Sequence, residues 1–142
     1  MKLFVIAEGR IKERGLRAVA NDYLARLTRY VGCEEIEARD ASALAKSIPE
    51  GAFLVALEVD GEHITSTELA ARLERWGARG KGLVAFVIGG AEGIPKSLSD
   101  RADLRLSLSS FTLPHRLARV VLLEQLYRAM TLQRGEPYAR EG

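Results

Sequence analysis

The sequence has a single cysteine, two histidines and no long hydrophobic run. Cys33 therefore has no partner for an intramolecular disulfide, and without a Cys or His cluster around it we interpret it as a buried or incidental thiol. No segment approaches the ~18 consecutive apolar residues of a membrane span, and the apolar start Leu3–Ala7 meets Glu8 too early for a signal peptide. We expect a cytoplasmic protein with neither a membrane nor a metal partner.

Net charge and aromatic content are also small. The 142 residues carry 21 Lys and Arg against 19 Asp and Glu, a formal charge of +2, and only 6% of them are aromatic. A mildly basic balance permits a nucleic-acid partner but does not require one. The length suits one domain with a sizeable core, and no repeat or linker divides the chain, so residues 1–142 are predicted to form a single domain.

The sequence does contain a regular alternation of strand and helix patterns. Apolar runs predict strands at Leu3–Ala7, Phe53–Val59 (ended by an Asp60-Gly61 turn) and Leu83–Ile88, with weaker candidates at Glu34–Ala38 and Leu104–Leu108. Between them, helical spacing and caps predict helices over Arg10–Val31, Ala41–Ile48, Thr65–Gly77, Pro95–Ala102 and Pro114–Arg134. This alternation is typical of an α/β fold with a mostly parallel sheet.

A glycine-rich loop, Gly89–Gly93, follows the most apolar strand. It resembles a phosphate-binding P-loop only superficially, because Pro95 stands where a glycine amide is needed and proline has no N–H to donate. The spacing of a dinucleotide-binding loop is absent as well. Two interpretations remain open: a plain turn, or a pocket lined by backbone for an uncharged or cationic group.

A second loop, Leu108–Leu113, mixes apolar residues with small hydroxyls between a strand and a helix. It can be a strand end with Ser or Thr capping, or a loop that grips a planar heterocycle, and the segment alone favours neither. Since the carboxyl ends of parallel strands meet at one edge of a sheet, the two loops are expected to lie together, where α/β proteins bind small ligands.

His115 begins the last predicted helix, where the helix dipole favours neutral imidazole, a form that can act as a base. His63 follows a turn and is expected to be solvated. Two basic groups are interpreted as solvated faces rather than RNA contacts: Arg116 and Arg119, and Arg10, Lys12, Arg14 and Arg17. The tail Glu136–Arg140 reads as a frayed end, although its Pro-Tyr pair can fold it back.

Several blocks of the chain, in order, resemble the bacterial ribosomal RNA large subunit pseudouridine N3-methyltransferases. The matching segments are Val87–Gly93, Leu106–His115, Arg119–Ala129, Met1–Leu3 and Gly135–Tyr138. The resemblance implies a SPOUT-type α/β knot, with a mostly parallel sheet, helices on both faces and a C-terminal trefoil knot. It also implies a homodimer that uses S-adenosyl-L-methionine to methylate N3 of a pseudouridine in 23S rRNA of the assembled ribosome.

The resemblance also implies site residues. Cofactor contacts fall on Leu57, Gly89, Leu108, Ser109, Ser110, Phe111, Thr112 and Leu113, and the catalytic candidates are His115 and Tyr138. Tyr138 and Arg140 are expected to hold the nucleotide across the dimer, while Ala139 replaces the histidine usual in the family's tail. Charge-poor loops would suit a phosphate-free sulfonium cofactor, and a side chain at an exposed Gly89 would block its pocket with little effect on the fold.

Two alternatives remain at this stage. A methyltransferase of the same fold can act on tRNA, and an RNA- or ribosome-binding module can use the same sheet without chemistry. The mild net charge, with no appended RNA-binding domain, indicates that target recognition is shared with the ribosome and the dimer partner.

Overall fold

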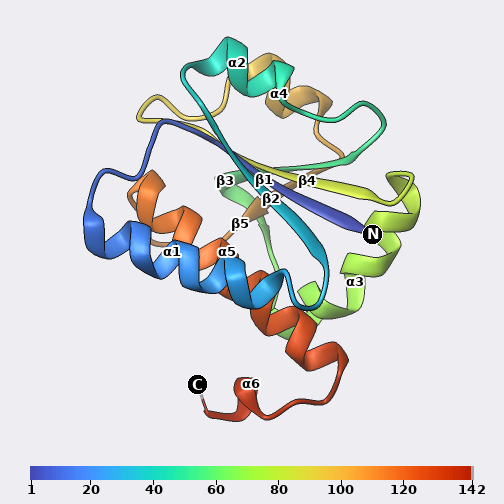
Figure 1. The fold of residues 1–142 in the computed structure, drawn as a ribbon. Coiled ribbons are helices and arrows are strands. Elements are labelled where there is room, and N and C mark those ends of the chain that lie inside the picture. Colours follow the sequence, from blue (N-terminus) through green and yellow to red (C-terminus); the bar gives the residue numbers. More distant parts are fainter. Residues whose placement is uncertain (142) are drawn as a thin grey trace.

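The computed structural model describes residues 1–141 and alternates strands with helices throughout (Figure 1). The strands are β1 (Lys2–Glu8), β2 (Gly32–Ala38), β3 (Phe53–His63), β4 (Leu83–Ile88) and β5 (Leu104–Ser107). The helices are α1 (Arg14–Leu27), α2 (Ala41–Lys46), α3 (Ser66–Arg79), α4 (Lys96–Arg101), α5 (His115–Gln133) and α6 (Tyr138–Glu141).

The strands form one sheet in the order β2-β1-β4-β3-β5, and every neighbouring pair is parallel. The central strand β4 is buried from Val84 to Ile88, and β1 is buried from Leu3 to Ala7. Such continuous apolar runs are expected where both faces of a parallel sheet are covered. The carboxyl ends of β1, β3, β4 and β5 therefore open onto the same edge.

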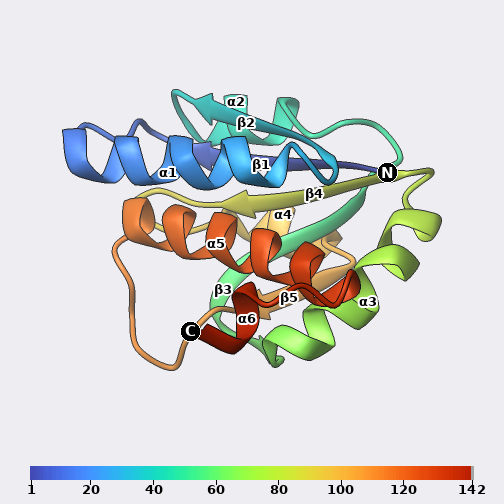
Figure 2. The same ribbon diagram turned by 60° about the horizontal axis from the view of Figure 1, so that its bottom comes forward.

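Helices cover both faces of the sheet. Helices α1, α3 and α5 pack on one face around Leu27, Leu73 and Leu123, while α2 and α4 cover the other with Leu44 and Leu98 (Figures 1 and 2). The predicted α/β architecture, with a parallel sheet between two helical layers, is confirmed. The trefoil knot stays a prediction. Within residues 1–141 no helix has the length and apolar content that crossing a membrane requires.

Strand β3 is longer than predicted. The expected turn at Asp60-Gly61 is wrong: the strand continues to His63 because β5 pairs with it on both sides of an irregularity, Leu106 lying opposite Leu57 and again opposite Glu62. Gly61 makes this possible, since a Cβ there would lie 2.7 Å from the carbonyl carbon of Arg105. The extra residues bulge outward beside the carboxyl edge of the sheet.

The predicted start of α1 at Arg10 is wrong by four residues. Ile11 is buried and its amide donates to a carboxylate oxygen of Glu37 at 3.2 Å, which keeps residues 9–13 outside the helix. The capping box of α3 is confirmed: the Thr65 hydroxyl accepts from the Glu68 amide, and the Glu68 carboxylate accepts from the Thr65 amide.

Candidate functional site

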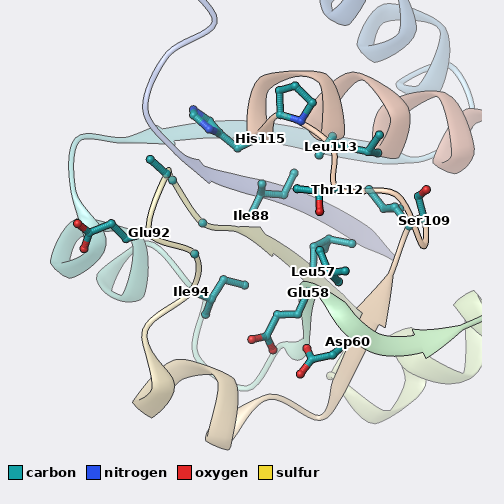
Figure 3. A pocket seen from close by; sticks show the side chains of 18 of the residues that line it. Leu57, Glu58, Asp60, Ile88, Glu92, Ile94, Ser109, Thr112, Leu113 and His115 are labelled. Atoms are coloured by element: carbon teal, nitrogen blue, oxygen red, sulfur yellow. The ribbon is translucent and has the colours of Figure 1, made fainter.

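Two loops and a segment of β3 at the carboxyl edge of the sheet enclose a pocket of about 650 Å³ (Figure 3). This volume lies within the range of roughly 300–1,000 Å³ typical of small-molecule sites. The walls come from the middle of β3, the glycine loop after β4, and the loop that joins β5 to α5. Its lining consists of residues 57–60, 88–94, 108–109, 111–115 and 118.

The glycine loop is a tightly closed turn. The Gly93 amide donates to the Gly90 carbonyl at 3.0 Å, and Gly93 has φ +79°, a conformation that favours glycine. Gly89 is buried, and a Cβ there would lie 2.5 Å from the Gly93 carbonyl oxygen. The predicted small effect on the fold depended on an exposed loop, and this condition is not met, because a side chain at Gly89 would collide with backbone before it reached any ligand.

Hydrogen bonds between residues two positions apart shape the loop between β5 and α5. The Ser107 hydroxyl donates to the Ser109 carbonyl at 3.0 Å, and the Ser109 hydroxyl accepts from the Phe111 amide at 2.9 Å. Phe111 is 81% exposed at the pocket rim, an unusual position for a large apolar side chain. Thr112 points toward Leu57 on the opposite wall (Figure 3). Backbone groups, a hydroxyl and apolar side chains thus face the same space.

The pocket lining is acidic. It contains the carboxylates of Glu58, Asp60 and Glu92, and neither a lysine nor an arginine. Arg105, outside the lining, donates from Nε to Glu58 at 2.8 Å and from Nη2 to Asp60 at 2.6 Å. The hydrogen bond and charge of Arg105 hold the pKa of Asp60 below its ordinary value. The two loops are charge-poor as expected, with Glu92 as their single charge, but β3 adds Glu58 and Asp60, which follow Leu57 in the sequence and make the whole lining acidic.

His115 lies at one end of the pocket, and Glu58 and Asp60 lie at the other (Figure 3). The imidazole belongs to the first residue of α5, which Pro114 precedes as the N-cap. Its ring is turned away from Leu57 (Figure 3). A flat ligand that enters from this end would meet the imidazole before it reached Glu58 and Asp60.

Tyr138 is not at the pocket of its own chain. Its hydroxyl donates to Glu124 at 2.9 Å and its ring meets Tyr127 edge-on with centroids 4.6 Å apart, so the tail does fold back. These partners lie roughly 14–18 Å along α5 from His115 at ~1.5 Å per residue. Burial, with hydrogen bonds to Tyr23 and Glu124, raises the pKa of Tyr138. The phenol therefore stays protonated at neutral pH and can donate a hydrogen bond.

Most of the predicted site residues share the pocket. Leu57, Gly89, Leu108, Ser109, Phe111, Thr112, Leu113 and His115 line it. Ser110 does not line it and is exposed. Sequence reasoning missed Glu58, Val59, Asp60, Ile88, Ile94, Pro114 and Ala118. Of these, Ala118 could have been found from its position one helical turn after His115.

A buried ion network lies beside the pocket. Arg119 is completely buried and donates from Nη1 to Glu35 at 3.0 Å and to Glu37 at 2.5 Å. Its Nη2 donates to the Gly9 carbonyl at 3.0 Å, and Arg17 pairs with both carboxylates. The interpretation of Arg119 as part of a solvated face is wrong, because two carboxylates from β2 neutralise it inside the fold.

The lining favours one class of ligand. Arg105 balances one of the three carboxylate charges, and the negative charge that remains repels phosphate and attracts a cation. Apolar walls and free backbone groups suit a flat heterocycle. Among residues 1–141 no group of three or more His, Cys, Asp or Glu is placed to hold a metal ion. Cys33 is half-buried in β2, and burial raises its pKa to about 12, which agrees with an unreactive thiol.

Comparisons with known proteins identify the family of the chain. Residues 1–139 match the family described as "Predicted SPOUT methyltransferase". The chain is similar to the Ribosomal RNA large subunit methyltransferase H of Sorangium cellulosum, with 55% identity over 98% of this chain and 99% of that protein. The protein of the same name from Acetivibrio thermocellus is 43% identical over 99% of this chain and 100% of its own length.

Solved structures with a similar fold include a methylase family protein. A probable methylase family protein from Haemophilus influenzae Rd KW20 superposes with a TM-score of 0.62 at 11% identity. The match covers 96% of this chain and 69% of that protein. At this identity the likeness concerns the fold alone.

Proposed function

Because the chain belongs to the SPOUT methyltransferase family, we propose that it transfers a methyl group from S-adenosyl-L-methionine to N3 of a pseudouridine in 23S rRNA of the assembled ribosome. The names of the similar proteins from Sorangium cellulosum and Acetivibrio thermocellus support ribosomal RNA of the large subunit as the substrate. Such an enzyme works in the cytoplasm, where ribosomes are.

The observation that carries the proposal is the acidic pocket without lysine or arginine in its wall. When bound, S-adenosylmethionine supplies a methyl carbon activated by a sulfonium cation, and it carries no phosphate. Glu58 and Asp60 favour that positive charge. Leu57 and Leu113 offer apolar walls to its adenine, and the backbone of the two loops offers donors and acceptors. The residues present therefore fit this cofactor.

The chemistry asks mainly for alignment. Methyl transfer is an in-line displacement, and positioning of donor and acceptor supplies a large share of such catalysis. The acceptor nitrogen must also lose its proton, either to a base or with the developing charge held on the carbonyl oxygens of the pyrimidine. His115, at the end of the pocket away from Glu58 and Asp60, takes the role of base or positioning group.

The second catalytic candidate requires a homodimer. Tyr138 lies far from the pocket of its own chain, so it can serve a methylation site only from a partner chain. In that role, with Arg140, it would hold the nucleotide as a hydrogen-bond donor, because its raised pKa keeps the phenol protonated at neutral pH. Ala139 leaves no tail histidine for that purpose, which gives His115 more weight.

The test is a substrate comparison. Assembled ribosomes, free large subunits and purified tRNA are incubated with the protein and isotope-labelled S-adenosylmethionine, and methylated bases are mapped by mass spectrometry. N3-methylpseudouridine in large-subunit rRNA of assembled ribosomes is expected. Methylation of tRNA alone would contradict the proposal that ribosomal RNA is the substrate. Absence of cofactor binding by calorimetry at near-millimolar ligand would contradict the enzymatic function itself.

A further inference from the structure

Three basic residues stand unpaired beside the pocket. Arg10, Lys12 and Arg14 are all exposed, and no carboxylate of residues 1–140 lies within ion-pair distance of any of them. We call these three residues the basic rim. Most other arginines near this edge are neutralised: Arg105 by two carboxylates and Arg116 by Glu13 at 3.3 Å.

The segment that carries the basic rim is anchored to the pocket at two points. Before it, the Glu8 carboxylate packs against Gly90, where a Cβ would lie 2.6 Å from Oε2. Within it, Glu13, between Lys12 and Arg14, pairs with Arg116, the neighbour of His115. Both Gly90 and His115 line the pocket. In Figure 3 the chain that follows β1 runs past His115.

Contacts with the interior of the protein hold the segment of the basic rim in place. Ile11, between two rim residues, is 6% exposed and its amide donates to Glu37. Glu37 also accepts from Arg119, whose Nη2 donates to the Gly9 carbonyl. With Ile11 turned into the core, its neighbours on either side are left to face solvent. The three cations are therefore displayed on a backbone that the buried ion network fixes before any partner arrives.

We infer that the basic rim binds phosphates of the RNA substrate and so sets the acceptor base over the pocket. This inference rests on the proposed function. The pocket lining is acidic and repels phosphate, so an RNA strand must keep its backbone outside while one base enters. The rim supplies unpaired cations at that place, and cations of this kind provide affinity and register rather than base specificity.

The test replaces all three rim residues, as Arg10→Gln/Lys12→Gln/Arg14→Gln. The matched control is Arg29→Gln/Lys46→Gln/Arg75→Gln, which removes the same charge from exposed, unpaired residues toward the opposite edge of the sheet. Binding of a fluorescein-labelled RNA stem-loop with pseudouridine in its loop is followed by anisotropy across a salt series. Michaelis constants are measured on assembled ribosomes, and cofactor affinity by calorimetry.

The affinity of the rim variant for RNA is expected to depend less on salt concentration than the affinity of the parent. Each phosphate contact contributes about 0.7 to 0.9 to the slope of log affinity against log salt, so three contacts give about 2–3. Over a fourfold rise in salt the parent should then lose roughly 20- to 40-fold more affinity than the variant. The KM for ribosomes should rise at least about tenfold at low salt. Cofactor affinity and kcat should stay near those of the parent, and Arg10→Lys/Arg14→Lys should retain RNA binding.

Other outcomes would overturn the inference. A rim variant with the parent's slope and KM has lost no phosphate contact. An equal loss in the control would show a general charge effect, and a large loss of cofactor affinity would show that the rim acts on the pocket. If the parent binds RNA through the rim but methylates no ribosomal RNA, the proposed function fails while the rim result stands. If the parent methylates ribosomes with an unaffected rim variant, the inference fails alone.

Discussion

Arg119 on α5 donates a hydrogen bond from Nη2 to the carbonyl of Gly9 at 3.0 Å, across 110 positions of sequence. The same guanidinium binds Glu35 and Glu37 of β2, and its Nε is buried without a hydrogen-bond partner among the described residues. One buried cation thus joins the helix that begins with His115, the second strand, and the loop after the first strand.

Replacement of Arg119 should be strongly destabilising. Arg119→Met leaves Arg17 as the single cation for Glu35, which is 7% exposed, and Glu37, and breaking a buried pair costs up to about 3–5 kcal/mol. Arg72→Met, which breaks pairs with the partly exposed Glu62 and Glu68, should cost about 0–1 kcal/mol. Urea unfolding at neutral pH measures both. Similar midpoints for the two variants would contradict a stabilising role for the network.

The network also predicts a dependence on pH. Burial opposes ionisation of Glu37, but hydrogen bonds from Arg119 and the Ile11 amide outweigh it and lower its pKa from 4.5. A lowered folded pKa contributes stability above the ordinary value, and that contribution is lost as pH falls through it. The free energy of unfolding should therefore fall below pH ~5, and less steeply in Glu37→Gln. If the free energy of unfolding fell equally steeply with pH in the parent and in the variant, the Glu37 carboxylate would not be a source of this pH dependence.

Two neighbouring glycines should respond differently to alanine. A Cβ at Gly89 meets the Gly93 backbone, which cannot move without distorting the loop, whereas a Cβ at Gly90 meets the flexible end of the Glu8 side chain. Gly89→Ala should cost about 1–3 kcal/mol through overpacking and weaken cofactor binding. Gly90→Ala serves as the control and should cost less. Thermal unfolding and calorimetry check both, and the reverse order would contradict the loop geometry.

The acidic lining predicts selective binding of a cation. At ~10 Å and an effective dielectric constant of ~30, one charge contributes about 1 kcal/mol. Glu58→Gln should therefore weaken S-adenosylmethionine by about 3- to 10-fold and leave neutral S-adenosylhomocysteine within about twofold. Glu62→Gln, on the same strand but outside the pocket lining, is the control. Equal losses for both ligands would point to a change of shape rather than of charge.

His115→Ala should reduce single-turnover methylation on ribosomes by about 10²–10⁴-fold if the imidazole takes the proton. The affinities for RNA and for the cofactor should change far less, because the His115 side chain lies at one end of the pocket. His63→Ala is a natural control, since the only other histidine is exposed at the end of β3 and outside the pocket lining. A normal single-turnover rate in the first variant would remove His115 from the mechanism.

Mixing of inactive variants tests the shared site. If His115 and Tyr138 act together from different chains of a two-fold dimer, mixed dimers of His115→Ala and Tyr138→Phe contain one intact site. Random exchange should then restore about a quarter of the parent activity. No recovery after verified subunit exchange would contradict a site shared in this way.

Much of the fold could be predicted from the sequence because its signals are local. The apolar run Leu83–Ile88 predicts a buried strand, and the Thr65–Glu68 pair predicts a helix start, since each depends on neighbours a few residues away. The turn at Asp60-Gly61 was wrong because pairing with β5 overrides the local preference. Strand pairing is a long-range interaction that local spacing does not report.

The site divides in the same way. The sequence by itself determined the two loops, Gly89–Gly93 and Leu108–Leu113, and through its resemblance the family, because both reside in the order of residues. Only the tertiary structure decided that Glu58 and Asp60 make the lining acidic and that Arg119 is buried. It also left Arg10, Lys12 and Arg14 unpaired beside the pocket. The environment of a charge depends on which distant groups the fold brings to it, and no spacing along the chain encodes that distance.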